Sequence, residues 1–472
     1  MRRTKIVCTL GPAVDSLESI KALIGAGMNV ARINMSHGSH ESAAATIALI
    51  KRARKETGVP LAILLDTKGP EVRIKTFERG EVDLKEGDGF VLTTNDVVGN
   101  GERVSISYPP LPGKVHIGDS ILLSDGMIEL KVEKTTATEI YTRVVDGGNL
   151  SNRKSINIPG AHLDMPYLSD ADRSDIIFGI EQDVDYIALS FVRCADDVKL
   201  IKMLLSLYPA AKEIQLIAKI ENREGVDNVA SILDFADGVM VARGDMGVEI
   251  PFEELPGIQK AMIKLAYKQG KKVITATQML ESMITNPRPT RAEISDVANA
   301  VYDGTSAVML SGETSVGKHP VEAVRTMSKI AVQAEAGIDY RGRFKKMDVD
   351  IKSITDTVSH SSVSASFDLH AKAIVAVSRS GFTIRKISRF RPACPIIGET
   401  TSEKAYHQLA MNWGVLPARA VDQENSDKLF SHAVAVAEKT GLVAPGDTIV
   451  IVAGVPVGQT GSTNTMKVDV VR

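Results

Sequence analysis

The sequence has little cysteine, and this limits the kinds of structural site it can carry. Its three cysteines, Cys8, Cys194 and Cys394, are odd in number and far apart, and no CxxC pair occurs. A disulfide framework needs paired cysteines, and a structural zinc site needs clustered ligands. The sequence therefore argues against both and fits a reducing cytosol.

Aromatic residues, net charge and long apolar runs are scarce as well. Only 4% of the residues are aromatic and the net charge is -2, so the sequence gives no support for base stacking or for attraction to nucleic acid or an acidic membrane. No window approaches the roughly 20 apolar residues that cross a bilayer. The chain start has no export signal with a cleavage site. We expect a cytoplasmic protein with no nucleic-acid or membrane partner.

The chain does have length and a regular alternation of strands and helices. Its 472 residues predict two or three domains. Eight apolar strands, each followed by a helical segment, are predicted at residues 4–9, 29–36, 59–66, 185–191, 215–220, 237–242, 272–277 and 307–310. Eight such units are typical of a (β/α)8 TIM barrel, an α/β fold whose site lies at the carboxyl ends of the strands.

Two further domains are predicted around this barrel. Residues 70–159 show Val, Thr and Ile runs divided by turn signals, which predicts an inserted small β-barrel domain, an all-β lid. Residues 341–472 form a C-terminal α/β domain that begins with a charge-rich linker at 341–348 and has strands at 371–378, 394–397, 415–420 and 447–453. The catalytic barrel is then assigned to residues 1–69 and 160–340.

Charged side chains stand at the ends of two neighbouring predicted strands. Lys219 and Glu221 are two residues apart and point to one side of an extended chain, and Asp245 follows the next strand. Two carboxylates beside a lysine suit a hard divalent cation and a moving phosphoryl group. The alternative for either strand alone is that charged residues cap a buried strand where it meets water.

Oxygen-bearing and cationic residues follow other strands. Arg32, Arg73 and Lys219 would repel one another at one cleft unless an anion such as phosphate, or acidic neighbours, balanced them. Thr277 and Ser311 end the last two barrel strands, where each is either a cap or a group that positions water or substrate. Neutral oxygens and one carboxylate, a set that suits a monovalent cation, come from Asn34, Ser36, Asp66 and Thr67.

Two loops have the composition of phosphate-binding segments. Residues 312–319 nearly match a Walker loop, but His319 stands where Ser or Thr should hold Mg²⁺, so we interpret the segment as a barrel loop with Pro320 in the first turn of a helix. In the C-terminal domain, hydroxyls and free amides suit an anion cradle, although a simple helix cap is an equal alternative. The residues concerned are Ser378, Arg379, Ser380, Gly381 and Thr383.

Seven segments in order along the chain resemble the pyruvate kinase family. The most specific is 216–225, LIAKIENREG, and the others are 32–38, 66–73, 241–249, 275–280, 286–291 and 309–313. The resemblance implies transfer of phosphoryl from phosphoenolpyruvate to ADP, giving pyruvate and ATP in glycolysis. It also implies a homotetramer and allosteric activation by a sugar phosphate or AMP bound at the 378–383 loop.

The resemblance also carries residue roles. It implies that Glu221 and Asp245 hold Mg²⁺ or Mn²⁺, and that Asn34, Ser36, Asp66 and Thr67 hold K⁺. Glu71 occupies the position that is glutamate in K⁺-dependent members. It implies catalytic roles for Lys219 and Arg32, nucleotide contacts at Arg73 and Lys154, and substrate contacts at Arg32, Lys219, Gly244, Asp245 and Thr277. From the residues themselves we add Thr277 and Ser311 as catalytic candidates and Asn34 and His37 as candidate nucleotide contacts.

Three questions stay open from the sequence. A Mg²⁺-dependent barrel lyase acting on pyruvate enolate would also use Glu221 and Asp245, although it would not need Lys219, Arg73 or a lid. A third possibility, from a different functional class, is a non-catalytic protein that binds a phosphorylated metabolite. The proton donor to the enolate is not evident, and our hypothesis is a water held near Thr277 and Ser311.

Overall fold

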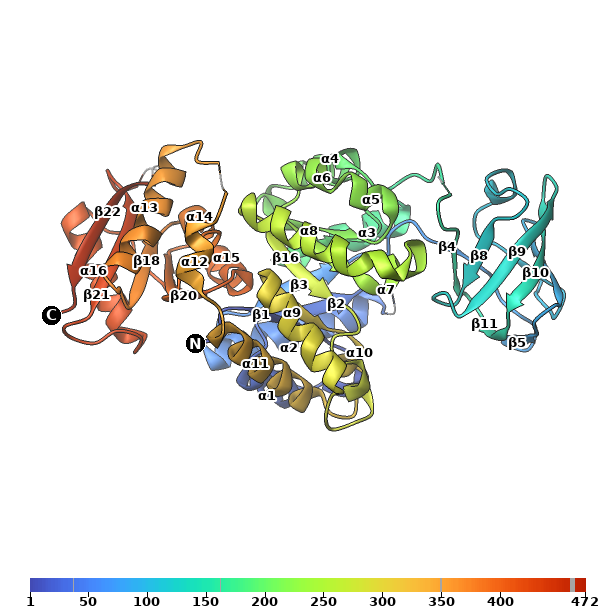
Figure 1. The fold of residues 1–472 in the computed structure, drawn as a ribbon, viewed down its shortest axis with the longest axis horizontal. Coiled ribbons are helices and arrows are strands. Elements are labelled where there is room, and N and C mark those ends of the chain that lie inside the picture. Colours follow the sequence, from blue (N-terminus) through green and yellow to red (C-terminus); the bar gives the residue numbers. More distant parts are fainter. Residues whose placement is uncertain (37, 162, 349, 459–462) are drawn as a thin grey trace.

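The structure is a computed structural model that describes residues 1–36, 38–161, 163–348, 350–458 and 463–472. The molecule is elongated, with the eight-stranded barrel in the middle, an all-β body at one end and an α/β body at the other (Figure 1). The N-terminus lies beside the barrel on its C-terminal-domain side, and the C-terminus lies at the far end of the α/β body (Figure 1).

The central barrel is closed and all its strands are parallel, as the sequence predicts. Strand order is β1-β17-β16-β15-β14-β13-β3-β2. Most of these strands are buried at every residue, because helices cover the outside and neighbouring side chains fill the inside. The strands are β1 (Lys5–Thr9), β2 (Val30–Asn34), β3 (Ala62–Asp66), β13 (Tyr186–Leu189), β14 (Gln215–Ile220), β15 (Gly238–Ala242), β16 (Lys272–Ala276) and β17 (Ala307–Leu310).

Helices surround this barrel, and several begin at sequence-encoded caps. Ser16, Ser39 and Thr290 each close a capping box with the residue three positions later. Pro320 begins a helix, as predicted, but the 312–319 segment is not wholly a loop, because a short helix occupies its first four residues. The helices are α1 (Leu17–Ala26), α2 (His40–Thr57), α3 (Asp170–Glu181), α4 (Ala195–Ser206), α5 (Arg223–Asp227), α6 (Val229–Phe235), α7 (Arg243–Glu249), α8 (Leu255–Lys268), α9 (Arg291–Asp303), α10 (Gly312–Ser315) and α11 (Pro320–Ala336).

The inserted β domain is a curled seven-stranded sheet with a two-stranded ribbon. Its edges meet at an isolated bridge between Ile74 and Ile106, so the sheet closes around its own apolar core. On the barrel side, Asn157 donates a hydrogen bond of 2.9 Å to Glu249 of α7. The strands are β4 (Val72–Arg73), β5 (Glu81–Leu84), β6 (Gly89–Thr93), β7 (Arg103–Ser105), β8 (Ser120–Leu123), β9 (Ile128–Thr135), β10 (Glu139–Asp146), β11 (Gly148–Ser151) and β12 (Ser155–Asn157).

The C-terminal domain is a five-stranded sheet, ordered β20-β19-β18-β21-β22, with helices on both faces (Figure 1). Two sequence predictions are wrong here. The expected linker contains a helix, α12 (Tyr340–Lys345), and an antiparallel fifth strand, β22 (Thr463–Val470), was not predicted. The other elements are α13 (Ile354–Asp368), β18 (Ala373–Val377), α14 (Phe382–Ser388), β19 (Ile396–Thr400), α15 (Glu403–Gln408), β20 (Val415–Arg419), α16 (Ser426–Lys439) and β21 (Thr448–Gly454).

This domain docks on the amino ends of the barrel strands. The Tyr186 hydroxyl donates to the Gln408 carbonyl over 2.7 Å, and Lys5 Nζ donates to the Val415 carbonyl over 2.7 Å. Met411 packs with the apolar side chains inside the barrel. The carboxyl ends of the strands are thereby left to face the inserted β domain.

Candidate active site

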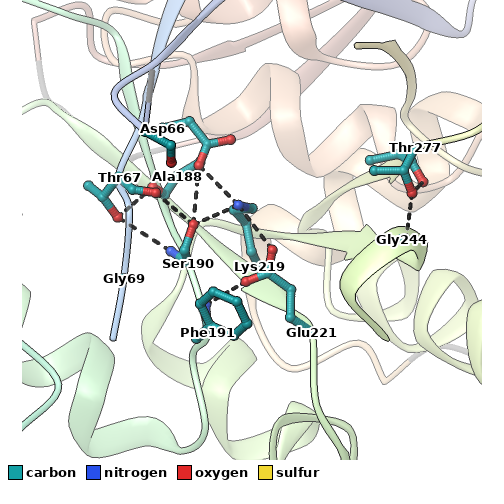
Figure 2. A network of polar contacts seen from close by, with 12 residues as sticks. Asp66, Thr67, Gly69, Ala188, Ser190, Phe191, Lys219, Glu221, Gly244 and Thr277 are labelled. Atoms are coloured by element: carbon teal, nitrogen blue, oxygen red, sulfur yellow. Dashed lines mark hydrogen bonds and ion pairs between the residues drawn. The ribbon is translucent and has the colours of Figure 1, made fainter. Parts of the chain in front are cut away.

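Lys219 is the centre of a buried polar network at the carboxyl ends of the barrel strands (Figure 2). Its Nζ lies 3.1 Å from Asp66 Oδ1 and 3.0 Å from Glu221 Oε1, and it donates to Ser190 Oγ over 2.6 Å. Burial alone would lower the pKa of Lys219, but the carboxylates of Asp66 and Glu221 raise it well above its ordinary value. The ammonium therefore keeps its charge at any physiological pH.

Arg32 and Asp66 form a second ion pair directly behind Lys219. The two residues come from the neighbouring strands β2 and β3, and Arg32 Nε donates to Asp66 Oδ2 over 2.6 Å. Thr9 accepts a hydrogen bond from Arg32 Nη1 at 2.9 Å, which fixes the guanidinium. Burial would raise the pKa of Asp66, yet Arg32 and Lys219 hold it below its ordinary value.

Glu221 is buried completely and has one oxygen without a hydrogen bond. Oε2 accepts from the Phe191 backbone amide at 2.6 Å, whereas Oε1 is aligned for no hydrogen bond from a described residue. Burial raises the pKa of this carboxyl to about 8, and the nearby Asp245 also disfavours its charge. Lys219 Nζ, at 3.0 Å, is the charged neighbour of Oε1, and a buried carboxylate beside a second carboxylate is a position where a further cation would be stabilising.

A cavity of about 250 Å³ opens beside this network, and both the barrel and the inserted β domain line it. The β-domain side contributes Arg73, Asp125, Lys154 and Ser155, and Glu71 holds Arg73 through an ion pair of 2.5 Å. The barrel side contributes Arg32, Asn34, Ser36, Lys68, Ser190, Phe191, Lys219, Glu221 and Asp245. Cations from two domains thus converge on one space.

The four residues assigned to a monovalent cation are close together but differently exposed. Asn34 and Ser36 line the cavity, while Asp66 and Thr67 are buried behind it. The Thr67 carbonyl accepts the Ser190 hydroxyl at 2.7 Å, and a carbonyl keeps a second lone pair. All four offer oxygen, so the set fits a hard cation chemically.

Thr277 and Gly244 form a separate pair to one side of the Lys219 network (Figure 2). The Gly244 amide donates to Thr277 Oγ1 over 2.8 Å, and Thr277 has a positive φ of 68°. Arg243 holds the Thr277 carbonyl at 2.6 Å and pairs with Asp296 at 2.7 Å. Neither these residues nor Ser311 line the cavity, and the Ser311 amide donates to Glu313 at 2.7 Å.

A second cavity, of about 120 Å³, lies in the C-terminal domain. Ser378, Arg379 and Ser380 line it together with Thr383 of α14, and Gly381, with φ of 73°, makes the turn into that helix. The Thr400 hydroxyl donates to the Arg379 carbonyl over 2.7 Å, which ties this turn to β19. The loop singled out in the sequence is thus part of a cavity wall.

Comparison with known proteins decides the family. Residues 1–324 match the family model described as pyruvate kinase, barrel domain, and residues 356–469 match pyruvate kinase, alpha/beta domain. A pyruvate kinase of Geobacillus stearothermophilus is 50% identical over all of this chain and 80% of its own length. A pyruvate kinase of Staphylococcus aureus (strain USA300) is 48% identical over all of this chain and 81% of its own length.

The chain belongs to the pyruvate kinase family. It is an enzyme, and the reaction of the family is the glycolytic phosphoryl transfer between phosphoenolpyruvate and ADP. This outcome confirms the resemblance found in the sequence and decides against the lyase and the non-catalytic alternatives. Within the described part of the chain, no helix combines the length and apolarity that a bilayer crossing requires.

The sequence reasoning missed several residues of this pyruvate kinase site. Ser190 and Phe191 were placed inside a predicted strand, but β13 ends at Leu189 and Phe191 has a positive φ of 54°. A polar residue at the carboxyl end of a barrel strand was the available signal for Ser190. Glu313, fully buried and bonded to the Leu280 and Ser311 amides, carried no such signal. His37 lies outside the described residues.

Proposed function

We propose that the cavity beside Lys219 is where phosphoryl passes from phosphoenolpyruvate to ADP. The observation that carries this proposal is the Lys219 ammonium, which is buried, permanently charged and held by Asp66, Glu221 and Ser190 next to the cavity. Phosphoryl transfer needs charge stabilisation more than covalent help from the protein. Lys219 supplies a fixed positive charge that costs no reorganisation when the phosphoryl moves.

Glu221 and Asp245 would hold Mg²⁺ or Mn²⁺. When bound, the divalent ion would neutralise charge on the phosphoryl oxygens. No group of three or more His, Cys, Asp or Glu residues capable of holding a metal occurs within the described ranges. A pair of carboxylates agrees with a Mg²⁺ site that takes its remaining ligands from substrate phosphate and water.

The other residues of the cavity would bind and orient the two substrates. Arg32 would contact phosphate, and Arg73 and Lys154 of the inserted β domain would contact nucleotide, together with Asn34 and His37. Gly244, Asp245 and Thr277 would receive the substrate carboxylate. Asn34, Ser36, Asp66 and Thr67 would hold K⁺, and Glu71 is the residue expected of a K⁺-dependent member.

Protonation of the enolate would use a water held near Thr277 and Ser311. Supporting this hypothesis, both residues follow barrel strands at the same end as Lys219. The test is to measure turnover and enolate protonation in Thr277→Ala and Ser311→Ala. Normal values in both variants would contradict the hypothesis.

The C-terminal cavity would bind a phosphorylated metabolite that activates the enzyme, and the chain would assemble as a homotetramer in the cytoplasm. The hydroxyls of Ser378, Ser380 and Thr383 support the first part, because hydroxyl groups and a nearby arginine suit phosphate. Arg379 is exposed and makes no ion pair with any described residue, so its charge remains available.

The test is an assay with phosphoenolpyruvate and ADP, with and without Mg²⁺ and K⁺, on Lys219→Met. We expect the variant to lose activity by about 100-fold or more, as when a group that stabilises a transition state is removed. Lys272→Met is the matched control, because Lys272 is another buried strand lysine but belongs to the amino end of β16. Full activity in Lys219→Met, with Lys272→Met equally active, would contradict the proposal.

A further inference from the structure

Both connections between the barrel and the inserted β domain pack against the turn that begins at Ser190. The outgoing connection passes at Gly69, where φ is 77° and a side chain would come within 2.8 Å of Ser190 Cβ (Figure 2). The returning connection passes at Tyr167, whose hydroxyl donates to the Ser190 carbonyl over 3.0 Å. The two connections of the inserted β domain therefore meet the barrel at one residue.

The same turn holds the two charged groups at the end of β14. Ser190 Oγ accepts from Lys219 Nζ at 2.6 Å, and the Phe191 amide donates to Glu221 Oε2 over 2.6 Å. The Val192 amide donates to the Lys219 carbonyl over 3.3 Å. Three successive residues of the turn are thus bonded to two residues of the active site. The position of the turn therefore sets the direction of the ammonium and of the carboxylate.

The backbone of this turn is strained at Phe191. Its φ of 54° lies in the left-handed region, which is costly for a residue with a bulky side chain. Strained backbone persists only where the surrounding contacts hold it in place. The bond from the Tyr167 hydroxyl to the Ser190 carbonyl acts directly before the strained residue. It is therefore placed to keep the turn in its strained conformation.

Tyr167 is itself held firmly. Its side chain is buried in the apolar core of the barrel. Burial raises the pKa of Tyr167 well above its ordinary value, so the hydroxyl keeps the proton that it donates. The Arg193 guanidinium lies 5.9 Å from the Tyr167 ring centre and donates to the carbonyls of Leu163 and Met165 over 3.4 and 3.1 Å. The whole returning connection is thereby fixed to the barrel.

We propose that Tyr167 is a positioning residue for phosphoryl transfer. It holds the Ser190 carbonyl and so fixes the turn that directs Lys219 and Glu221, although it does not line the cavity beside them. This inference rests on the proposed function, in which Lys219 acts on the phosphoryl group and Glu221 on the divalent ion. A small displacement of a catalytic group lowers the rate, and loss of the contacts behind a metal ligand lowers metal affinity.

Tyr167→Phe tests the proposal, because it keeps the aromatic ring and removes only the hydroxyl. We expect kcat to fall about tenfold. The dissociation constant of Mn²⁺ on the substrate-free enzyme, measured by electron paramagnetic resonance, should rise about tenfold. Arg193→Lys is a second variant, which keeps the charge but loses the fork that holds two carbonyls, and both values should change in the same direction. It decides the question by the same measurements if Tyr167→Phe does not fold.

Tyr186→Phe is the matched control. Tyr186 is also buried, and its hydroxyl also donates to a backbone carbonyl, that of Gln408, over 2.7 Å. It lies at the opposite end of β13 from the turn. This variant should lose thermal stability but keep the kcat and the Mn²⁺ affinity of the wild type, which separates a positioning role from a structural one.

The outcomes also separate this inference from the proposed function. Wild-type kcat and Mn²⁺ affinity in Tyr167→Phe, or an equal loss of both in Tyr186→Phe, would overturn the positioning role of Tyr167. If Lys219→Met is inactive at the same time, the proposed function stands. Full activity in Lys219→Met would instead overturn the proposed function, and the role of Tyr167 with it.

Discussion

Ser190 shows how much of the site depends on a single hydroxyl that holds the catalytic lysine in place. Its hydroxyl accepts a hydrogen bond from Lys219 Nζ at 2.6 Å and donates one to the Thr67 carbonyl at 2.7 Å. The serine thereby links the central lysine to the backbone that follows β3. We assign it as a positioning residue, because it fixes the direction of the ammonium without having to touch the phosphoryl group.

Ser190→Ala should lower kcat by about tenfold and change KM for phosphoenolpyruvate little. The lysine keeps its ion pairs with Asp66 and Glu221 but loses the third contact that orients it, and small misplacements of a catalytic group are costly. Steady-state kinetics check this expectation. Ser306→Ala is the control, a buried serine at the amino end of β17. An equal fall in both variants would mean that the serine is only structural.

At the scale of elements, helix starts in the barrel were predictable and some strand ends were not. Serine and threonine caps are local signals in the sequence, and α1 and α2 begin directly after Ser16 and Ser39. The end of β13 is set instead by the turn at Phe191, which tertiary contacts impose. The strand β22 was missed because most of its residues are exposed and its sequence has no regular apolar alternation.

The site residues also divide into those that the sequence could predict and those that it could not. Lys219, Glu221 and Asp66 were found because barrel topology brings strand ends together whatever the loops do. The separation of Thr277 and Ser311 from the cavity could not be seen in the sequence, since it depends on loop conformations after β16 and β17. The position of Asp125 in the cavity wall could not be seen in the sequence either, because only docking of the inserted β domain brings this residue to the barrel.

The helix α9 is connected to Thr277 by a chain of contacts that runs through Arg243. Thr290 caps this helix, and Asp296 within it holds Arg243, which in turn holds the Thr277 carbonyl. Thr290→Ala should destabilise the first turns of α9 by about 1 kcal/mol. Amide hydrogen exchange in α9 should then be about fivefold faster, because exchange follows the free energy of local opening.

Ser295→Ala is the control for this experiment. Ser295 lies on the same helix and is exposed, and its hydroxyl bonds only back to the Arg291 carbonyl. Its exchange rates should match those of the wild type. Equal rates in Thr290→Ala and Ser295→Ala would show that the cap contributes nothing measurable to α9.

At the scale of the whole molecule, the barrel has a different neighbour at each end. The inserted β domain lies at the carboxyl ends of the strands, where both domains line the cavity of the site. The C-terminal domain covers the amino ends through Gln408, the last residue of α15, and Val415, the first residue of β20. The strands that carry Lys219 and Arg32 therefore run from the interface with the C-terminal domain to the interface with the inserted β domain. Both domains thus contact the same barrel.

Lys5 makes the interface with the C-terminal domain sensitive to pH. Burial lowers the pKa of Lys5 from 10.5 to about 7, so the folded protein releases its proton earlier than the unfolded chain. This contribution to stability is present above the unfolded pKa and is lost as the pH falls from 10.5 to about 7. The thermal midpoint of Lys5→Met should consequently rise less between pH 7 and pH 10 than that of the wild type. Lys51→Met, which changes an exposed lysine of α2, should keep the wild-type slope, and a slope in Lys5→Met as steep as in this control would refute the role of Lys5.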